Sequence, residues 1–69
     1  MKQKYYVNNN PQPNGDHEVH VTTCRYFSMM YNRTFLGEFE SCHEAVRVAK
    51  MRHSKANGCL HCCMPCHTT

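Results

Sequence analysis

Apolar and polar residues alternate in short stretches that predict the strands of a small sheet. Residues 5–7 form a β-type run of two tyrosines and a valine. In residues 18–22, Val19 and Val21 occupy one face of an extended chain, and the polar side chains between them occupy the other. Because such alternation is typical of half-buried strands, both stretches are predicted to be strands.

Two loops are predicted beside these strands. Residues 8–16 contain asparagines, two prolines and the pair Asn14-Gly15. Because Pro fixes φ and Asn-Gly readily adopts positive φ, this stretch is predicted to be a flexible loop that returns the chain as an irregular hairpin. Residues 25–33 show no clear period and are predicted to be a loop anchored by aromatic side chains.

A third strand is predicted over residues 34–39, where Phe35, Gly37 and Phe39 alternate with other side chains. In a regular strand these three residues would share one face. Gly37 weakens the prediction, because glycine has no side chain to pack against a neighbouring strand. The expected order along the chain is therefore three strands followed by a helix.

The helix is predicted to begin at Ser41, because Ser41 and Glu44 have the Ser-x-x-Glu form of a capping box. Residues at three- and four-residue spacing then form a modestly apolar stripe, which consists of Cys42, Ala45, Val46, Ala49 and His53. The basic residues that lie away from the stripe are Arg47, Lys50 and Lys55. Gly58 is predicted to end the helix as a C-terminal cap.

Composition changes this picture, because the chain has few residues with which to build a core. Of its 69 residues only 10 are Leu, Ile, Val or Phe, and a chain this short is one domain at most. The net charge of +3 is too small to keep the chain expanded. Small domains with weak cores usually rely on disulfides or a structural metal, so one of these is expected within a single domain spanning residues 1–69.

The expected compartment decides between metal and disulfide. The first eight residues lack the apolar run of a secretory signal, and no stretch is long enough to cross a membrane. A cytoplasmic protein with reduced thiols is therefore expected, in which closely spaced cysteines are more often metal ligands. If the chain is instead a processed mature form, its six cysteines would indicate disulfides.

The candidate ligands are concentrated near the C-terminus. Cys59 and Cys62 form a Cys-x-x-Cys turn, which lets two sulfurs face one zinc ion. A tetrahedral zinc needs two more ligands, and His20 and Cys24 supply them near the end of the second predicted strand. Together these residues give a Cys3His set.

Several residues around this set resemble the small zinc-binding module of bacterial Ada-type alkylation-response proteins. The motifs that carry the resemblance are His20-x-x-x-Cys24-Arg25-Tyr26, Asn32, Phe39, Ser41, Glu44-Ala45 and Gly58-Cys59-x-x-Cys62. They span about two thirds of the chain. The resemblance implies that His20, Cys24, Cys59 and Cys62 bind zinc, although Asn57-Gly58 stands where these modules usually have a proline before the second pair. The string as a whole also resembles small cysteine-rich bacterial proteins, which implies no activity.

The remaining cysteines permit a second metal site. Adjacent cysteines such as Cys62 and Cys63 are expected to point in different directions, so one ion is not expected to bind both. The possible second set is Cys42, Cys63, Cys66 and His67. Alternatively, Cys42 is a buried small hydrophobe on the helix stripe.

Other chemistries fit the sequence less well. Residues 63–67 have the Cys-x-x-Cys-His form of c-type haem attachment, but the chain has no export signal and few aliphatic residues to surround a haem. A thiol-redox role is also possible, although thioredoxin-like pairs open a helix rather than follow one. His17, His43 and His61 are expected to be surface histidines or histidines whose ring nitrogens form hydrogen bonds, rather than metal ligands. No Ser/His/Asp set, phosphate loop or paired carboxylates indicate a hydrolytic enzyme.

The sequence therefore predicts a small α+β domain with an antiparallel sheet of two or three strands, one helix and a C-terminal zinc knuckle. The predicted function is that of a noncatalytic module in which zinc is structural and which binds a protein or nucleic acid, with no role at a membrane. The competing prediction is a thiol-active protein, either a redox switch or a methyl-accepting zinc thiolate. Its reactive residue would be an exposed zinc-bound cysteine such as Cys24.

Overall fold

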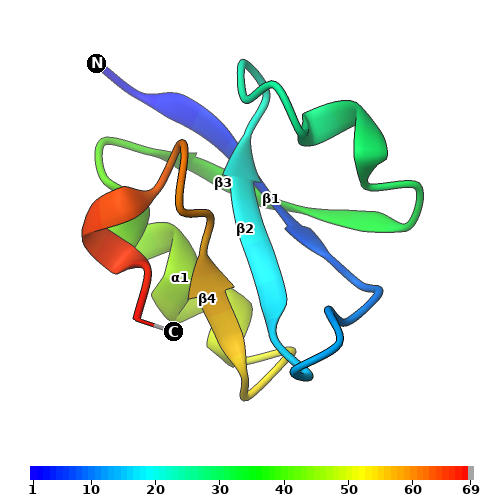
Figure 1. The fold of residues 1–69 in the computed structure, drawn as a ribbon. Coiled ribbons are helices and arrows are strands. Elements are labelled where there is room, and N and C mark those ends of the chain that lie inside the picture. Colours follow the sequence, from blue (N-terminus) through cyan, green and yellow to red (C-terminus); the bar gives the residue numbers. More distant parts are fainter. Residues whose placement is uncertain (69) are drawn as a thin grey trace.

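The computed structural model describes residues 1–68, which form a four-stranded sheet and one α-helix (Figure 1). In chain order the elements are β1 (Gln3–Asn8), β2 (His17–Val21), the 3-10 helix η1 (Phe27–Met29), β3 (Arg33–Phe39), α1 (Cys42–Lys50), β4 (Ala56–Gly58) and the 3-10 helix η2 (Met64–Cys66). The predicted α+β class is confirmed. Within these residues, no helix has the length and apolar character needed to cross a bilayer.

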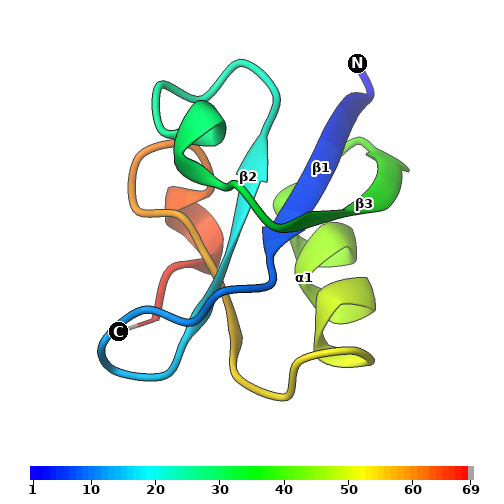
Figure 2. The ribbon, with the colours of Figure 1, turned by 90° about the vertical axis from the view of Figure 1, so that its right-hand side faces the viewer.

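The strand order is β3-β1-β2-β4, and the sheet is mixed. β1 pairs antiparallel with β2 and with β3, as the sequence predicts, whereas β4 pairs parallel with β2. The prediction of two or three antiparallel strands is therefore short by one strand. Helix α1 packs on the sheet at the lower right of Figure 2. The loop that carries η1 lies at the upper left of that view, away from α1.

A β-bulge changes the face of the sheet on which the β3 side chains lie. Tyr6 pairs with Phe35 and Tyr5 pairs with Gly37, so Leu36 is the extra residue. Leu36 and Phe39 pack against the core, whereas Phe35 is half exposed and contacts the ring of Tyr6. The prediction that Phe35 and Phe39 share a face is wrong, because alternation counted from the sequence does not include the bulge.

Helix α1 has the predicted apolar stripe but not the predicted end. Cys42, Ala45 and Ala49 are buried, and Val46 packs against them. Ser41 is the N-cap residue, but its side chain makes no capping hydrogen bond, so the predicted capping box is not formed. The helix ends at Lys50 rather than at Gly58, because the chain turns after Lys50 and then pairs with β2.

Strand β4 is short, and its polar contacts explain how Ala-Asn-Gly becomes a strand. All three of its residues are buried. The Asn57 side chain donates a hydrogen bond to Asp16 Oδ2 at 3.2 Å, and its Oδ1 accepts hydrogen bonds from the Gly58 and Thr68 backbone N–H groups. These contacts hold β4 against the sheet edge. They also connect it to the predicted loop of residues 8–16, whose flexibility stays a prediction.

A disulfide joins Cys42 of α1 to Cys66 of η2, with a Cα–Cα distance of 6.4 Å. This pairing differs from the expectation that all six thiols are reduced. It also shows that Cys42 is more than an apolar filler on the helix stripe. The disulfide fastens the C-terminal segment to the helix.

The C-terminal segment also packs closely on Gly58, and this generates a prediction for Gly58→Ala. A Cβ atom at Gly58 would lie 2.7 Å from the Cys63 carbonyl oxygen and 2.8 Å from Cys66 Cβ. Such overpacking should lower the free energy of unfolding by about 1–3 kcal/mol. Chemical denaturation measures this loss. Ser54→Ala, at an exposed position, is the control and should stay within about 0.5 kcal/mol of the original protein. Equal stability of Gly58→Ala and the control would contradict the packing.

Candidate metal centre

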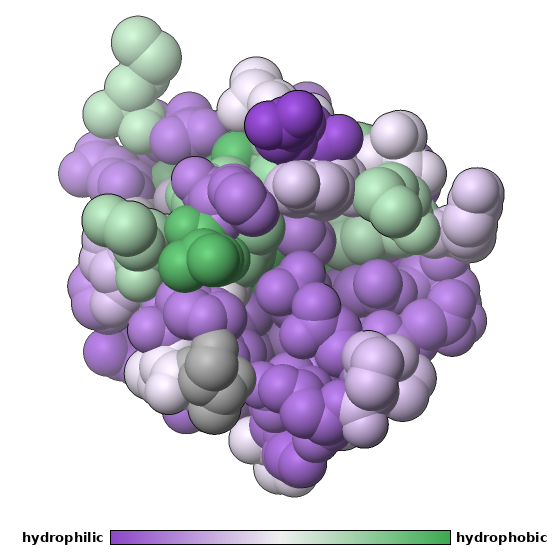
Figure 3. All heavy atoms as spheres, viewed as in Figure 1, coloured by the Kyte–Doolittle hydropathy of each residue, from purple (hydrophilic) through white to green (hydrophobic). Residues whose placement is uncertain are grey.

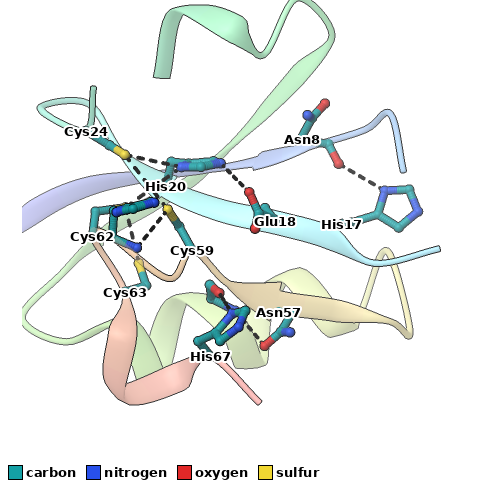
Figure 4. Close-up of polar contacts among 12 residues, drawn as sticks. Asn8, His17, Glu18, His20, Cys24, Asn57, Cys59, Cys62, Cys63 and His67 are labelled. Carbon is teal, nitrogen blue, oxygen red and sulfur yellow. Dashed lines mark hydrogen bonds and ion pairs between the residues drawn. The ribbon is translucent and has the colours of Figure 1, made fainter. Parts of the chain in front are cut away.

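Four residues from two distant parts of the chain converge at one end of β2. They are His20, Cys24, Cys59 and Cys62, and their potential ligand atoms all lie within 4.8 Å of one another (Figure 4). His20 and Cys59 are buried, whereas Cys24 and Cys62 are half-buried. The structure therefore brings together the four residues that the sequence assigns to one metal centre, and this group is geometrically able to bind a metal ion.

Three distances within this group are close to those of tetrahedral coordination. Bonds of about 2.3 Å from zinc to sulfur and about 2.0–2.1 Å to nitrogen place two sulfurs about 3.8 Å apart, and a sulfur about 3.5 Å from a nitrogen. The Sγ atoms of Cys24 and Cys59 are 3.9 Å apart. His20 Nδ1 lies 3.4 Å from Cys24 Sγ and 3.8 Å from Cys62 Sγ. An ion at the centre of this group therefore needs little rearrangement of the side chains.

Local backbone hydrogen bonds place the ligands. The Cys24 N–H donates to the Val21 carbonyl at 3.0 Å, which turns the chain back after β2. The Cys59 N–H donates to the Val19 carbonyl at 3.1 Å, which continues the pairing of β4 with β2. The Cys63 N–H then donates to the Cys59 carbonyl at 2.8 Å and closes the Cys-x-x-Cys turn. Each half of the centre is thus a turn held by its own hydrogen bond.

Glu18 supports the histidine ligand, and sequence reasoning did not identify this role. Its Oε1 lies 3.2 Å from His20 Nε2, while His20 Nδ1 faces the sulfurs. Metal-binding histidines commonly donate their second ring N–H to a carboxylate, which fixes the tautomer and the ring orientation. The sequence did carry a signal for this contact. Glu18 and His20 are two residues apart in a predicted strand, and residues at that spacing share a face.

The thiols of this centre are held in their neutral form when no metal is bound. Burial raises the pKa of Cys59 to about 12. The hydrogen bond with the neighbouring Cys63 thiol, followed by burial, raises the pKa of Cys62 to about 11. Burial also raises the pKa of Cys24. A metal ion must therefore displace protons from these thiols in order to bind.

Backbone N–H groups near the sulfurs oppose this effect. The N–H groups of Cys62 and His61 contact Cys59 Sγ and act to lower its pKa, and the Tyr26 backbone acts in the same way on Cys24. Hydrogen bonds of this kind stabilise the thiolate form. They are therefore in place to stabilise thiolates once a metal ion is bound.

The four residues of the predicted second site do not form one group. Cys42 and Cys66 are joined by the disulfide. Cys63 is fully buried, and its Sγ lies 3.8 Å from the sulfur of Cys62 in the first centre. His67 Nδ1 instead forms a hydrogen bond of 3.0 Å with the Gly58 carbonyl. The structure therefore does not bring Cys42, Cys63, Cys66 and His67 together as the predicted second site, and each of them has a different partner.

The histidines that were expected to be surface or satisfied residues have such environments. His17 Nδ1 forms a 2.9 Å hydrogen bond with the Asn8 carbonyl. The rings of His17 and His53 are stacked, with their centroids 3.8 Å apart. His43 and His61 are exposed. His61 also contacts the ring of Tyr26, with the ring centroids 4.9 Å apart.

Comparisons of the chain with protein-family models, with curated proteins and with solved structures found no match. The interpretation of the centre therefore depends on its geometry and chemistry.

The raised thiol pKa values generate a prediction for the pH dependence of metal binding. Three thiols, those of Cys24, Cys59 and Cys62, are protonated near neutral pH in the folded chain, and a thiol in an unfolded chain, with a pKa of about 8.5, is mostly protonated there too, so each must release a proton. The apparent Kd for zinc should therefore fall by about 1000-fold when pH rises from 7 to 8. Competition with a chromophoric chelator, corrected for protonation of the chelator, measures this slope. A Kd that does not change with pH would show that the thiols are not ligands.

The contact between Glu18 and His20 generates a second prediction. Glu18→Gln should keep the fold but weaken zinc binding by about 10–100-fold, because the amide polarises the imidazole less than a carboxylate does. Glu38→Gln, an exposed change on β3, is the matched control and should leave the affinity unchanged. The same chelator competition measures both variants. Equal affinities for the two would contradict the role of Glu18.

Proposed function

We propose that this chain is a small noncatalytic module in which one zinc ion is structural. The observation that carries the proposal is the set of four protein ligands at tetrahedral distances. Three thiolates and one imidazole are typical of zinc sites, and a full set of protein ligands leaves no open position for water or substrate.

The position of the centre supports a structural role. His20 and Cys24 belong to the end of β2, whereas Cys59 and Cys62 belong to the segment after β4. A zinc ion therefore joins the middle of the sheet to the C-terminal segment. Structural zinc in small domains contributes about 10–16 kcal/mol of apparent binding free energy, which is folding free energy when no site exists in the unfolded chain. A contribution of this size compensates for the small number of core residues.

The module is proposed to bind a protein or nucleic acid through its sheet edge or its basic residues. Strand β3 is at one edge of the sheet, so its outer backbone groups can pair with an extended peptide. The guanidinium carbon of Arg33, at the start of β3, lies 4.6 Å from the centre of the Phe27 ring. On the face seen in Figure 3, hydrophilic side chains dominate the lower half and hydrophobic ones form separate patches above. The face in this view is therefore not a broad apolar interface, and the proposed contact is a peptide added to the edge of β3.

Thiol chemistry is the second candidate function. Cys24 and Cys62 are only half-buried, so a small electrophile can reach their sulfurs, and the resemblance to Ada-type modules favours a methyl-accepting zinc thiolate. The disulfide between Cys42 and Cys66 favours a redox function instead. Both of these candidates require a reactive sulfur, which the structural proposal does not.

The structural proposal predicts that the domain needs its metal. Removing zinc with a chelator, while the disulfide is kept intact, should abolish cooperative thermal unfolding, and adding zinc back should restore it. Circular dichroism and differential scanning calorimetry measure this change. A matched sample treated with the zinc-saturated chelator is the control. A metal-free protein with the same cooperative melt would refute a structural role for the ion.

Alkylation separates the two candidate functions. If zinc is purely structural, the zinc-loaded protein should resist a small methyl donor such as methyl iodide, and all thiols should react after chelation and denaturation. Mass spectrometry of the intact chain counts the methyl groups. Rapid transfer of one methyl group to Cys24 in the zinc-loaded protein would favour the methyl-accepting function, and Cys24→Ser would identify the sulfur.

A further inference from the structure

A second group of metal-ligating atoms lies around the disulfide. The sulfurs of Cys42 and Cys66 and a ring nitrogen of His43 all lie within 4.8 Å of one another. Both cysteines are buried, whereas His43 is exposed. This group differs from the set that the sequence predicts, because His43 takes the place of Cys63 and His67.

The group opens to the surface through a pocket of about 440 Å³. Cys66 and His43 line this pocket, together with Arg47 and Lys50. A small reductant or a metal ion can therefore reach the disulfide from solvent on the Cys66 side. Only three protein ligands are present, so a water or small anion from the pocket must complete a four-ligand site. The two cationic side chains favour an anion such as chloride.

The position of Cys42 favours the thiolate form of its side chain once the disulfide is reduced. Cys42 is the first residue of the nine-residue helix α1. The partial positive charge at a helix N-terminus stabilises a nearby thiolate. The thiolate is the form of cysteine that binds a metal ion, and the nearby His43 ring supplies a third donor. The closeness of the three donor atoms, the pocket that reaches them and the charge at the helix N-terminus thus all favour metal binding by the reduced cysteines.

We propose that Cys42, His43 and Cys66 form a redox-dependent second metal site. In the oxidised protein the two sulfurs are bonded to each other and do not bind the ion. A phosphine breaks the S–S bond by supplying two electrons and becomes a phosphine oxide with an oxygen from water, whose two protons produce two thiols. A zinc ion then displaces those two protons and binds both thiolates and His43. The disulfide and the second ion therefore exclude each other.

This site is chemically separate from the first centre, although both fasten the same C-terminal segment. The first centre connects that segment to β2, and the second group connects it to α1. Either the disulfide or the second ion can keep η2 against the helix. The domain is thus expected to bind one zinc ion when oxidised and two when reduced, with its fold retained.

Native mass spectrometry tests the proposal by counting zinc ions per chain before and after phosphine treatment in the presence of zinc. The count should rise by one on reduction, together with the gain of two hydrogens seen for the denatured chain. The count in the oxidised protein tests the first centre, and the increment on reduction tests the second. Failure of the proposed structural zinc would therefore be distinguishable from failure of this inference.

Variants identify the ligands. His43→Ala should weaken binding of the additional ion by at least about 10–100-fold, since loss of a ligand should cost no less than loss of an outer partner. Cys66→Ser should abolish the increment. Glu44→Ala is the matched control, because Glu44 is equally exposed in the first turn of α1 but belongs to neither group, and it should keep the increment. No additional ion on reduction, or an increment unaffected by His43→Ala, would overturn the proposal.

Discussion

The parallel pairing of β4 with β2 is the interaction on which the metal centre depends. Val19 pairs with Gly58, and the Cys59 N–H extends this register by donating to the Val19 carbonyl. The next residue along β2 is His20, so the pairing places the first cysteine of the knuckle beside the histidine ligand. A shift of one residue would turn His20 or Cys59 away from the centre, because successive strand side chains point to opposite faces. Three residue pairs between β2 and β4 therefore determine that the two halves of the candidate centre meet.

The convergence of His20, Cys24, Cys59 and Cys62 was the most predictable part of the structure. The Cys-x-x-Cys and His-x-x-x-Cys spacings are local, and each needs only a turn to bring its own two ligands together. The three antiparallel strands and the apolar stripe of α1 were also predictable, since their periods are visible in the sequence. The position of Glu18 beside His20 follows from the same alternation, once His20 is taken as a ligand.

The features that sequence analysis missed depend on contacts between distant residues. β4 consists of Ala56, Asn57 and Gly58, which have little intrinsic preference for a strand, and it is held by Asn57 against Asp16, 41 residues away. The bulge at Leu36 depends on how β1 and β3 pair. The disulfide between Cys42 and Cys66 depends on where the C-terminal segment packs. None of these contacts produces a local pattern, and that is why the helix was extended too far and the second cysteine cluster was assigned wrongly.

The separation of the two halves of the centre has a consequence for synthesis of the protein in the cell. His20 and Cys62 are 42 residues apart, so a nascent chain presents His20 and Cys24 as an incomplete ligand pair while most of the domain is still being translated. Strands β1, β2 and β3 can associate in that interval, but contacts of such long range form late. An ion that needs all four of these residues can be bound only after the Cys59–Cys62 turn has emerged from the ribosome.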